Sequence, residues 1–200
     1  MQNSDGQVAG IVTFLSDDAH LFESTLQTEA VFDGKLLHVR RDRVRLPDGS
    51  EAIREHVLHP GAVMVIPVLD NGALVMERQF RYPLGLVFLE LPAGKIDAGE
   101  DPLATAQREL LEETGYSARR WTHLGCIHPV ISYSNEQIEI YLAQELTLEG
   151  RKLDQGEFLD VVEVHLPEAI EMVRNGGITD AKTLSGLLWA ERVLDGRWRS

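Results

Sequence analysis

One predicted helix, residues 101–114, limits what this chain can fold into more than any other feature. Its apolar residues recur at helical spacing and should fix one face of the helix to a hydrophobic core; they are Leu103, Ala106 and Leu110. Asp101 is suited to cap the start of this helix, with Pro102 at the first helical position, and Gly115 is suited to end it. The chain must therefore build a core beside an amphipathic helix.

The neighbouring arc of the same helix is acidic. Glu109, Glu112 and Glu113 share this arc because each residue advances about 100° around a helix. Like charges one turn apart destabilise a helix by roughly 0.2–0.5 kcal/mol per pair, and a divalent cation that prefers oxygen ligands would offset that repulsion. The alternative is an ordinary amphipathic helix with solvated glutamates. The preceding loop, residues 93–100, favours the cation because it directs backbone carbonyls toward the helix start.

The remaining pattern predicts an α+β fold in two parts. Residues 1–56 are expected to form an N-terminal tail and a small antiparallel β-sheet, with a short helix at 17–26, strands from residue 28 and an Asp33-Gly34 turn. Residues 57–200 are expected to form the main domain, a mixed sandwich of strands and a few helices. Its expected strands are 61–69, 73–80, 84–91, 121–127, 137–142 and 160–165, a Pro-Ala-Gly loop follows the third of these, and its further helices are 167–175 and 180–194.

Composition excludes several classes of protein. Lysine and arginine number 19 against 32 aspartates and glutamates, and a net charge of −13 argues against a nucleic-acid binder. No apolar run is long enough to span a membrane, and the first ten residues lack the basic region of a secretion signal. The single cysteine, Cys126, cannot form an intrachain disulfide. We therefore expect a cytoplasmic protein that binds neither nucleic acid nor membrane.

A known motif occupies the stretch from Gly94 to Gly115. These residues follow the pattern GX5EX7REUXEEXGU, where U is a bulky aliphatic residue, and depart from it only at the last position, which is Tyr116. The pattern is the Nudix box, so the chain resembles the Nudix hydrolase family. Segments 77–81, 90–94, 128–136, 154–158 and 178–183 are similar to the ADP-ribose pyrophosphatase branch, and the likeness covers roughly residues 28–195. Pro129 lies closer to the box than the proline typical of that branch.

The resemblance implies a fold and a reaction. The fold is the Nudix α/β/α sandwich with a mixed sheet. The reaction is Mg²⁺-dependent hydrolysis, with Mn²⁺ as a substitute, of the diphosphate in ADP-ribose or related nucleoside diphosphate sugars, which gives AMP and ribose 5-phosphate or the equivalent products. Two alternatives stay open: hydrolysis of other sugar nucleotides such as GDP- or UDP-sugars, and a Nudix module that senses ADP-ribose without cleaving it.

The same resemblance assigns the metal and catalytic residues. The metal ligands are the carbonyl of Ala93 and the carboxylates of Glu109 and Glu113, and Glu112 would serve a second ion. Arg108 would orient a carboxylate of the box, the alternative being a plain ion pair with Glu112 one turn away. Glu157, on a Gly-preceded loop, is the expected base that activates water, and Glu112 is the alternative base.

Substrate contacts and assembly are implied in the same way. The expected substrate-binding residues are Arg54, Arg81, Glu90, Gly94 and Glu136, with Arg81 on the phosphates. His56, His59 and His128 are interpreted as structural. Residues 32–55 contain no tryptophan, so the base preference is left open. The small sheet is too small to bury a face alone, and the resemblance implies a homodimer in which residues 32–54 contribute to the neighbour's pocket.

Overall fold

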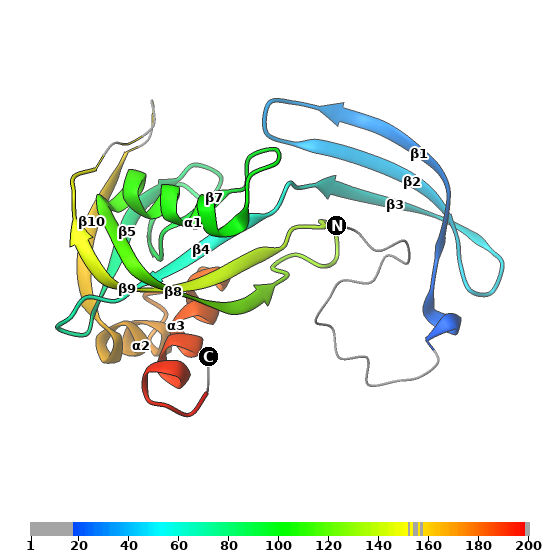
Figure 1. Cartoon of the computed structure of the whole chain (residues 1–200). Coiled ribbons are helices and arrows are strands. Elements are labelled where there is room, and N and C mark those ends of the chain that lie inside the picture. Colours follow the sequence, from blue (N-terminus) through cyan, green and yellow to red (C-terminus); the bar gives the residue numbers. More distant parts are fainter. Residues whose placement is uncertain (1–17, 152, 154–155, 157, 199–200) are drawn as a thin grey trace. The chain divides into compact units, whose positions relative to one another are not determined.

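The structure is a computed structural model that describes residues 18–151, 153, 156 and 158–198. The chain divides into two compact units, Met1–Val57 and Leu58–Ser200 (Figure 1). Strand β3 ends at Leu58, so the division falls at the end of that strand. None of the described helices is long and apolar enough to span a lipid bilayer.

The smaller unit is a three-stranded sheet. Its strands are β1 (Ser24–Asp33), β2 (His38–Arg45) and β3 (Glu51–Leu58), in the order β1-β2-β3, and β1 runs antiparallel to β2. The expected helix at 17–26 is wrong, because only a 3₁₀ turn, η1 (Ala19–Leu21), forms there. Asp18 makes no side-chain capping bond to this turn, and Ser24 already pairs with Arg45 of β2. The segment from Ser24 onward therefore pairs with β2 and does not continue a short, uncapped helix.

The sheet of the smaller unit buries little apolar surface of its own. Val44 is the only apolar side chain buried among the described residues of this unit, and every residue of β1 is exposed. Its exposed large apolar residues are Leu21, Phe22, Leu26, Val31, Phe32, Leu36, Leu37 and Ile53. A two- or three-stranded sheet without a covered apolar face is marginally stable in water.

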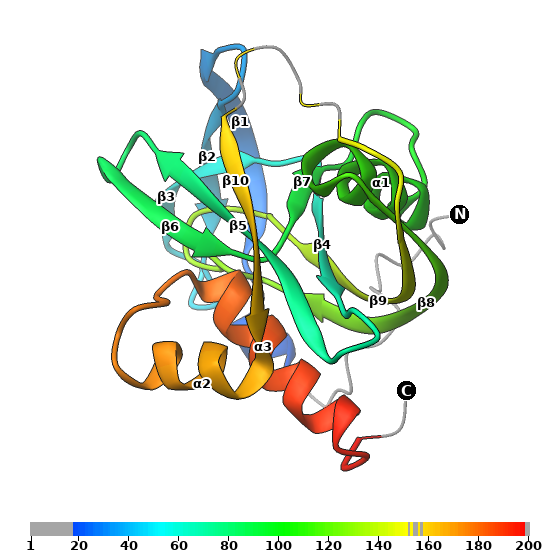
Figure 2. The same ribbon diagram turned by 90° about the vertical axis from the view of Figure 1, so that its left-hand side faces the viewer.

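The larger unit contains two sheets (Figure 2). One has the order β7-β4-β9-β8, and β4 and β9 are parallel whereas the other neighbours are antiparallel. Its strands are β4 (Ala62–Pro67), β7 (Ala93–Lys95), β8 (Tyr116–Ile127) and β9 (Ile138–Leu148). The other sheet is antiparallel, with the order β10-β5-β6, and consists of β5 (Ala73–Arg81), β6 (Leu86–Glu90) and β10 (Leu159–His165).

Helices cover these sheets on both sides of β4. They are α1 (Pro102–Glu109), continued by a π-helical turn, η2 (Leu110–Thr114), then α2 (Leu166–Arg174) and α3 (Ala181–Leu194). Val63 of β4 packs with Ala106 of α1, whereas the next residue, Met64, packs in a second cluster with Leu187 of α3. Successive side chains of a strand point to opposite faces, so β4 is buried on both. The mixed α+β sandwich expected from the sequence is confirmed.

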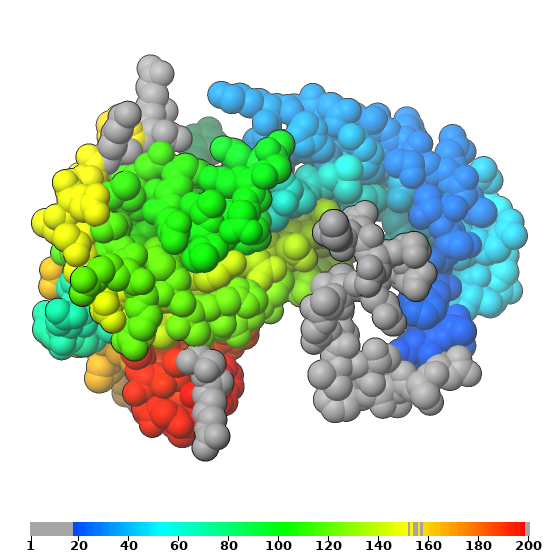
Figure 3. Space-filling model, in the orientation of Figure 1, coloured from blue at the N-terminus to red at the C-terminus, as the bar shows by residue number. Residues whose placement is uncertain are grey.

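Two features of the larger unit differ from the expectations. The Pro-Ala-Gly stretch was expected as a loop, but Ala93–Lys95 forms β7, which pairs with Ala62–Met64 at the edge of β4. Three residues are too few to show a strand pattern in the sequence. The segment is extended because it pairs with β4. Strands β8 and β9 are also longer than expected. In Figure 3 the green atoms of α1 and the yellow-green atoms of β8 are both at the surface on the same face of the larger unit.

Candidate active site

The site is built around α1 and its π turn. The Asp101 side chain accepts hydrogen bonds from the backbone N–H of Leu103 at 3.0 Å and of Ala104 at 3.3 Å, and Gly115, at φ +80°, ends the helix. The predicted helix at 101–114 and its caps are therefore confirmed. The last turn is π rather than α, a form that often occurs at functional sites. This turn carries Glu112 and Glu113.

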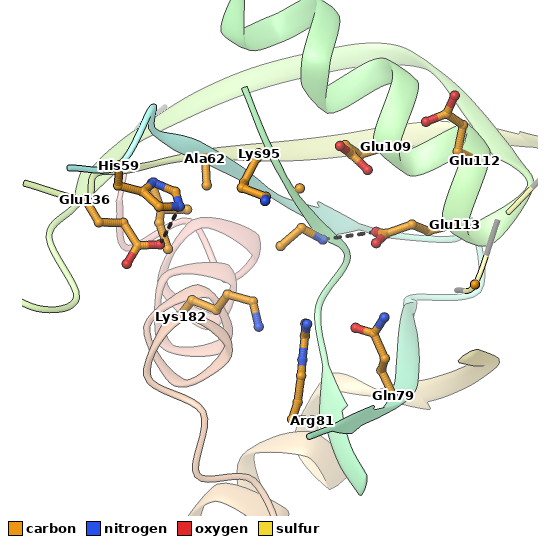
Figure 4. A pocket seen from close by; sticks show the side chains of 14 residues that line it. His59, Ala62, Gln79, Arg81, Lys95, Glu109, Glu112, Glu113, Glu136 and Lys182 are labelled. Atoms are coloured by element: carbon orange, nitrogen blue, oxygen red, sulfur yellow. Dashed lines mark hydrogen bonds and ion pairs between the residues drawn. The ribbon is translucent and has the colours of Figure 1, made fainter. Parts of the chain in front are cut away.

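A cavity of about 510 Å³ lies beside this turn, within the larger unit (Figure 4). Carboxylates from α1 and its π turn line one wall, and cationic side chains from β5 and α3 line the wall opposite. The lining residues are His59, Ala62, Gln79, Arg81, Ala93, Gly94, Lys95, Glu109, Glu112, Glu113, Glu136, Ile138, Gly156 and Lys182.

The acidic wall is tied to strand β7. Glu113 is only 4% exposed, and its Oε2 accepts a hydrogen bond from the backbone N–H of Ala93 at 3.2 Å. Glu109 packs against Gly94, where an added Cβ would lie 1.9 Å from the carboxylate carbon of Glu109. No side chain fits at that point, so glycine allows the helix and β7 to approach. The backbone of Ala93 and two carboxylates thus share one wall.

Arg108 holds three carboxylates of this region. It donates to both oxygens of Glu100 at 3.0 and 2.9 Å, to Glu109 at 2.8 Å and to Glu112 at 3.1 Å. The hydrogen bonds from Arg108 lower the pKa of Glu100 to about 2, and the pKa of Arg108 itself is raised. The ion pair between Arg108 and Glu112 is therefore only one of the contacts that Arg108 makes with carboxylates. Arg108 also supplies positive charge between Glu109 and Glu112, whose mutual repulsion a metal ion was expected to offset.

The opposite wall contains a buried carboxylate behind two cations. Glu90 is 3% exposed; it accepts hydrogen bonds from Arg81 at 2.7 and 2.8 Å and from Lys182. Burial by itself would raise the pKa of Glu90, but the hydrogen bonds from Arg81 and the charge of Lys182 outweigh it and hold the pKa below its ordinary value. Glu90 is therefore ionised behind the wall and is not among the residues that line the cavity.

A histidine and a glutamate line another side of the cavity. The Nε2 atom of His59 lies 3.8 Å from Oε1 of Glu136 (Figure 4). The N–H of Gly61 donates to Nδ1 of His59 at 3.1 Å, so in the neutral ring Nε2 carries the proton and faces Glu136. The side chain of Asn135 accepts a hydrogen bond from the backbone N–H of His59 at 2.7 Å and fixes the two segments together.

Comparison with known proteins identifies the architecture. The NUDIX domain description matches residues 58–185. The chain belongs to the Nudix hydrolase family. Residues 23–57 match the nucleoside diphosphate sugar hydrolase N-terminal domain.

Individual Nudix relatives cover most of the chain. It is 42% identical over 165 residues to the ADP-ribose pyrophosphatase of Bacillus subtilis, an alignment that covers 82% of this chain and 89% of the relative. It is 40% identical to the methanol dehydrogenase activator of Bacillus methanolicus, with 81% of this chain and 89% of the relative covered. Among solved structures, a crystal structure of an ADP compounds hydrolase matches with a TM-score of 0.79 and 27% identity, over 89% of this chain and 97% of that one.

Most of the site residues predicted from the sequence line this cavity or contact residues that line it. Ala93, Gly94, Glu109, Glu112, Glu113, Arg81 and Glu136 line it, and Arg108 and Glu90 hold lining residues from behind. Arg54 lies on β3 of the smaller unit, where it donates to Glu23 at 3.0 and 2.5 Å. Glu157 lies outside the described residues.

Four polar side chains that line the cavity were not predicted as site residues from the sequence: His59, Gln79, Lys95 and Lys182. Gln79 had a usable signal, because it stands two residues before Arg81 on β5 and strand side chains alternate between faces. His59, interpreted as structural, lines the cavity because the chain before β4 passes beside Glu136. Lys182 follows the cap of a helix far along the chain, and its place beside Arg81 depends on the packing of α3.

Proposed function

We propose that this Nudix protein is a Mg²⁺-dependent hydrolase that cleaves the diphosphate of ADP-ribose or related nucleoside diphosphate sugars. The products would be AMP and ribose 5-phosphate, or the corresponding nucleotide and sugar phosphate. The observation that carries this proposal is a cavity that has Glu109 and Glu113 on one wall and Arg81 and Lys182 on the wall opposite (Figure 4). The name of the Bacillus subtilis relative, an ADP-ribose pyrophosphatase, supports the choice of substrate.

The acidic wall suits a hard divalent cation. Its donors are the carbonyl of Ala93 and the carboxylates of Glu109, Glu113 and Glu112. Within the described part of the chain, no three carboxylate, imidazole or thiol groups cluster closely enough to form a finished metal cage. Mg²⁺ does not need one, since it keeps several waters and binds through one or two carboxylates together with substrate phosphates. We therefore propose Mg²⁺, with Mn²⁺ as a substitute, and the bound ion would neutralise phosphate charge.

The residues of the chain have separate tasks in the reaction. A water oxygen forms a new bond to one phosphorus, the bond from that phosphorus to the bridging oxygen breaks, and the bridging oxygen leaves with the other phosphate. Arg81 would bind the phosphate oxygens through its planar guanidinium, which Glu90 orients at 2.7 and 2.8 Å. Arg108 would keep the carboxylates of Glu109 and Glu112 in place.

We assign the role of base to Glu157, which would take the proton from water. The support is its position in the 154–158 segment, which is similar to the ADP-ribose pyrophosphatase branch. Glu112 is the alternative base, but one of its oxygens accepts a hydrogen bond from Arg108 at 3.1 Å. That oxygen is therefore already engaged by a side chain before any water binds.

We further propose a homodimer, in which residues 32–54 contribute to the nucleotide site of the neighbouring chain. The support is the smaller unit itself, which buries only Val44 among its described apolar side chains and leaves Phe32 and Ile53 exposed. A second copy could cover these residues. Light scattering should give about twice the chain mass of 22.4 kDa, and a fully active monomer would contradict the shared site.

The single cysteine, Cys126, supports a cytoplasmic location.

A substrate panel tests the proposal and its alternatives. We expect AMP to be released from ADP-ribose faster than GMP or UMP from the corresponding sugar nucleotides. The match of residues 23–57 to a nucleoside diphosphate sugar hydrolase domain keeps GDP- and UDP-sugars as the second candidates. Release of GMP or UMP alone would select them. Tight ADP-ribose binding without any product would select a sensing module.

A further inference from the structure

We propose that Lys182 forms a two-cation clamp with Arg81 that binds the substrate diphosphate, and that Glu90 is the positioning residue that holds both cations. The choice of a diphosphate rests on the function proposed above. No role was assigned to Lys182 by the sequence, and Glu90 was expected to be a substrate-binding residue. The structure places Glu90 behind the wall, where it can act only through its neighbours.

Glu90 joins three separate elements. It ends β6, Arg81 ends β5, and Lys182 stands in the first turn of α3. Its side chain is 4% exposed, and both of its oxygens accept hydrogen bonds from Arg81, one of them also from Lys182. A buried carboxylate is costly unless it is paired and hydrogen-bonded, and removing one partner of such a pair leaves an uncompensated charge. This arrangement therefore fixes the positions of both cations.

Lys182 is held from a second side by the helix cap. Asp180 caps α3 through the N–H of Thr183 and accepts a hydrogen bond from Nζ of Lys182 at 2.7 Å. The hydroxyl of Thr183 accepts from the backbone N–H of Leu91, directly after Glu90. The Lys182 side chain is 13% exposed, yet it lines the cavity. Its flexible stem is thus ordered before any ligand binds.

Both cations have N–H donors left for a ligand. An ammonium group has three N–H donors, and Lys182 directs two of them at Glu90 and Asp180. A guanidinium has five, and Arg81 directs two at Glu90 through Nε and Nη2. One donor of Lys182 and three of Arg81 remain beyond the partners found among the described residues. Both side chains reach the same wall of the cavity, across from Glu109 and Glu113 (Figure 4).

This geometry matches a diphosphate better than a single anionic group. A diphosphate carries oxygens on two phosphorus atoms, so one face can meet the two cations while the other faces the acidic wall through a metal ion. Glu90 and Asp180 accept hydrogen bonds from these cations and balance their charge. A purely structural alternative exists, in which Lys182 only fastens α3 to the end of β6.

Steady-state kinetics and a binding titration separate these alternatives. The variants are Lys182→Met, Glu90→Gln and the double variant, and the control is Arg174→Met, which removes a cation from the exposed pair with Glu171 on α2. Each is measured for KM and kcat with ADP-ribose, and for its affinity for inorganic pyrophosphate in Mg²⁺ buffer by calorimetry. Melting temperatures report on folding.

The clamp predicts a specific pattern. Lys182→Met should weaken pyrophosphate binding and raise KM by about 10–100-fold, as for the loss of a charge-assisted hydrogen bond, and the control should match the wild type. Glu90→Gln should also raise KM, and by a smaller factor when Lys182 is already methionine, because the part of its effect that acts through Lys182 is then absent while the part that acts through Arg81 remains. A lowered melting temperature with KM and pyrophosphate affinity within twofold of the wild type would establish the structural alternative and overturn the clamp.

Two further conditions keep the test decisive. If Lys182→Met does not fold, Lys182→Gln keeps N–H donors near Glu90 while it removes the charge, and the same loss of affinity is expected. If the wild type cleaves no sugar nucleotide, the proposed function fails, but the pyrophosphate titration still judges the clamp. Pyrophosphate bound equally well by Lys182→Gln and the wild type would refute it.

Discussion

The carboxylate of Glu109 lies against the backbone of Gly94, so closely that a Cβ at residue 94 would be 1.9 Å from its carboxylate carbon. The same strand presents the N–H of Ala93 to Glu113 at 3.2 Å. One three-residue strand, β7, therefore sets the positions of two proposed metal ligands.

Gly94→Ala should displace Glu109 from the cavity wall. The carboxylate would have to move, because the nearest atoms all belong to the Glu109 side chain that the site uses. We expect kcat/KM for ADP-ribose to fall by about 10²-fold, as for a catalytic group that is misplaced by an ångström, with a weaker response to Mg²⁺. Gly99→Ala is the control for alanine at a glycine, since nothing lies within 4 Å of that position although its φ is +80°. Equal activity in both variants would contradict the role of this contact.

Mg²⁺ should stabilise the folded protein. An ion that binds only the folded chain adds about 2.7 kcal/mol at a concentration 100 times its dissociation constant. Thermal melting with Mg²⁺ and with EDTA measures this effect, and Glu113→Gln should reduce it because a charged oxygen is removed from the acidic wall. An unchanged melting temperature together with full turnover in EDTA would rule out the metal site.

Acid should remove a contribution of Glu100 to stability. The hydrogen bonds from Arg108 lower its pKa from 4.5 to about 2 in the folded state, so the ionised form favours folding. This contribution is fully present above the unfolded pKa near 4.5 and is lost as the pH falls toward about 2. Urea unfolding of the wild type and Glu100→Gln should therefore give curves that differ at pH 6 and converge between pH 4.5 and 2. A difference that does not change with pH would show that the Arg108 contact does not stabilise the ionised carboxylate.

The roles of base and metal ligand can be separated by two variants. Glu157→Gln should lower kcat by about 10²–10⁴-fold, as for a lost general base, with little change in the Mg²⁺ concentration needed for half activity. Glu113→Gln should instead raise that concentration as well as lower the rate. If Glu157→Gln retains activity within a few-fold of the wild type, the base is Glu112 or another group, and Glu112→Gln is the next variant to measure.

The parts of the site that the sequence predicts are those encoded locally. Asp101, Pro102 and Gly115 set the ends of the helix by capping, and its periodicity places Leu110 in the core and Glu113 near the cavity. The end of that helix shows the limit of this reasoning, since a π turn replaces the regular geometry on which the arc of glutamates was based.

The cationic wall could not be predicted in the same way. Lys182 and Glu90 are separated by 92 positions in the sequence, and only the packing of α3 beside β6 joins them. His59 faces Glu136 because its ring accepts a hydrogen bond from Gly61 and its backbone is held by Asn135, contacts that no periodicity reveals. Segment resemblance pointed to residues 178–183 and 128–136, but the partner of each side chain depends on the tertiary fold.

The most direct test of the proposed reaction is ³¹P NMR of ADP-ribose incubated with the 200-residue protein and Mg²⁺. The diphosphate signals should be replaced by two phosphomonoester signals, those of AMP and ribose 5-phosphate, and added EDTA should stop the change. Persistence of the diphosphate signals in ADP-ribose, and in GDP- and UDP-sugars under the same conditions, would contradict the assignment of this cavity to diphosphate hydrolysis.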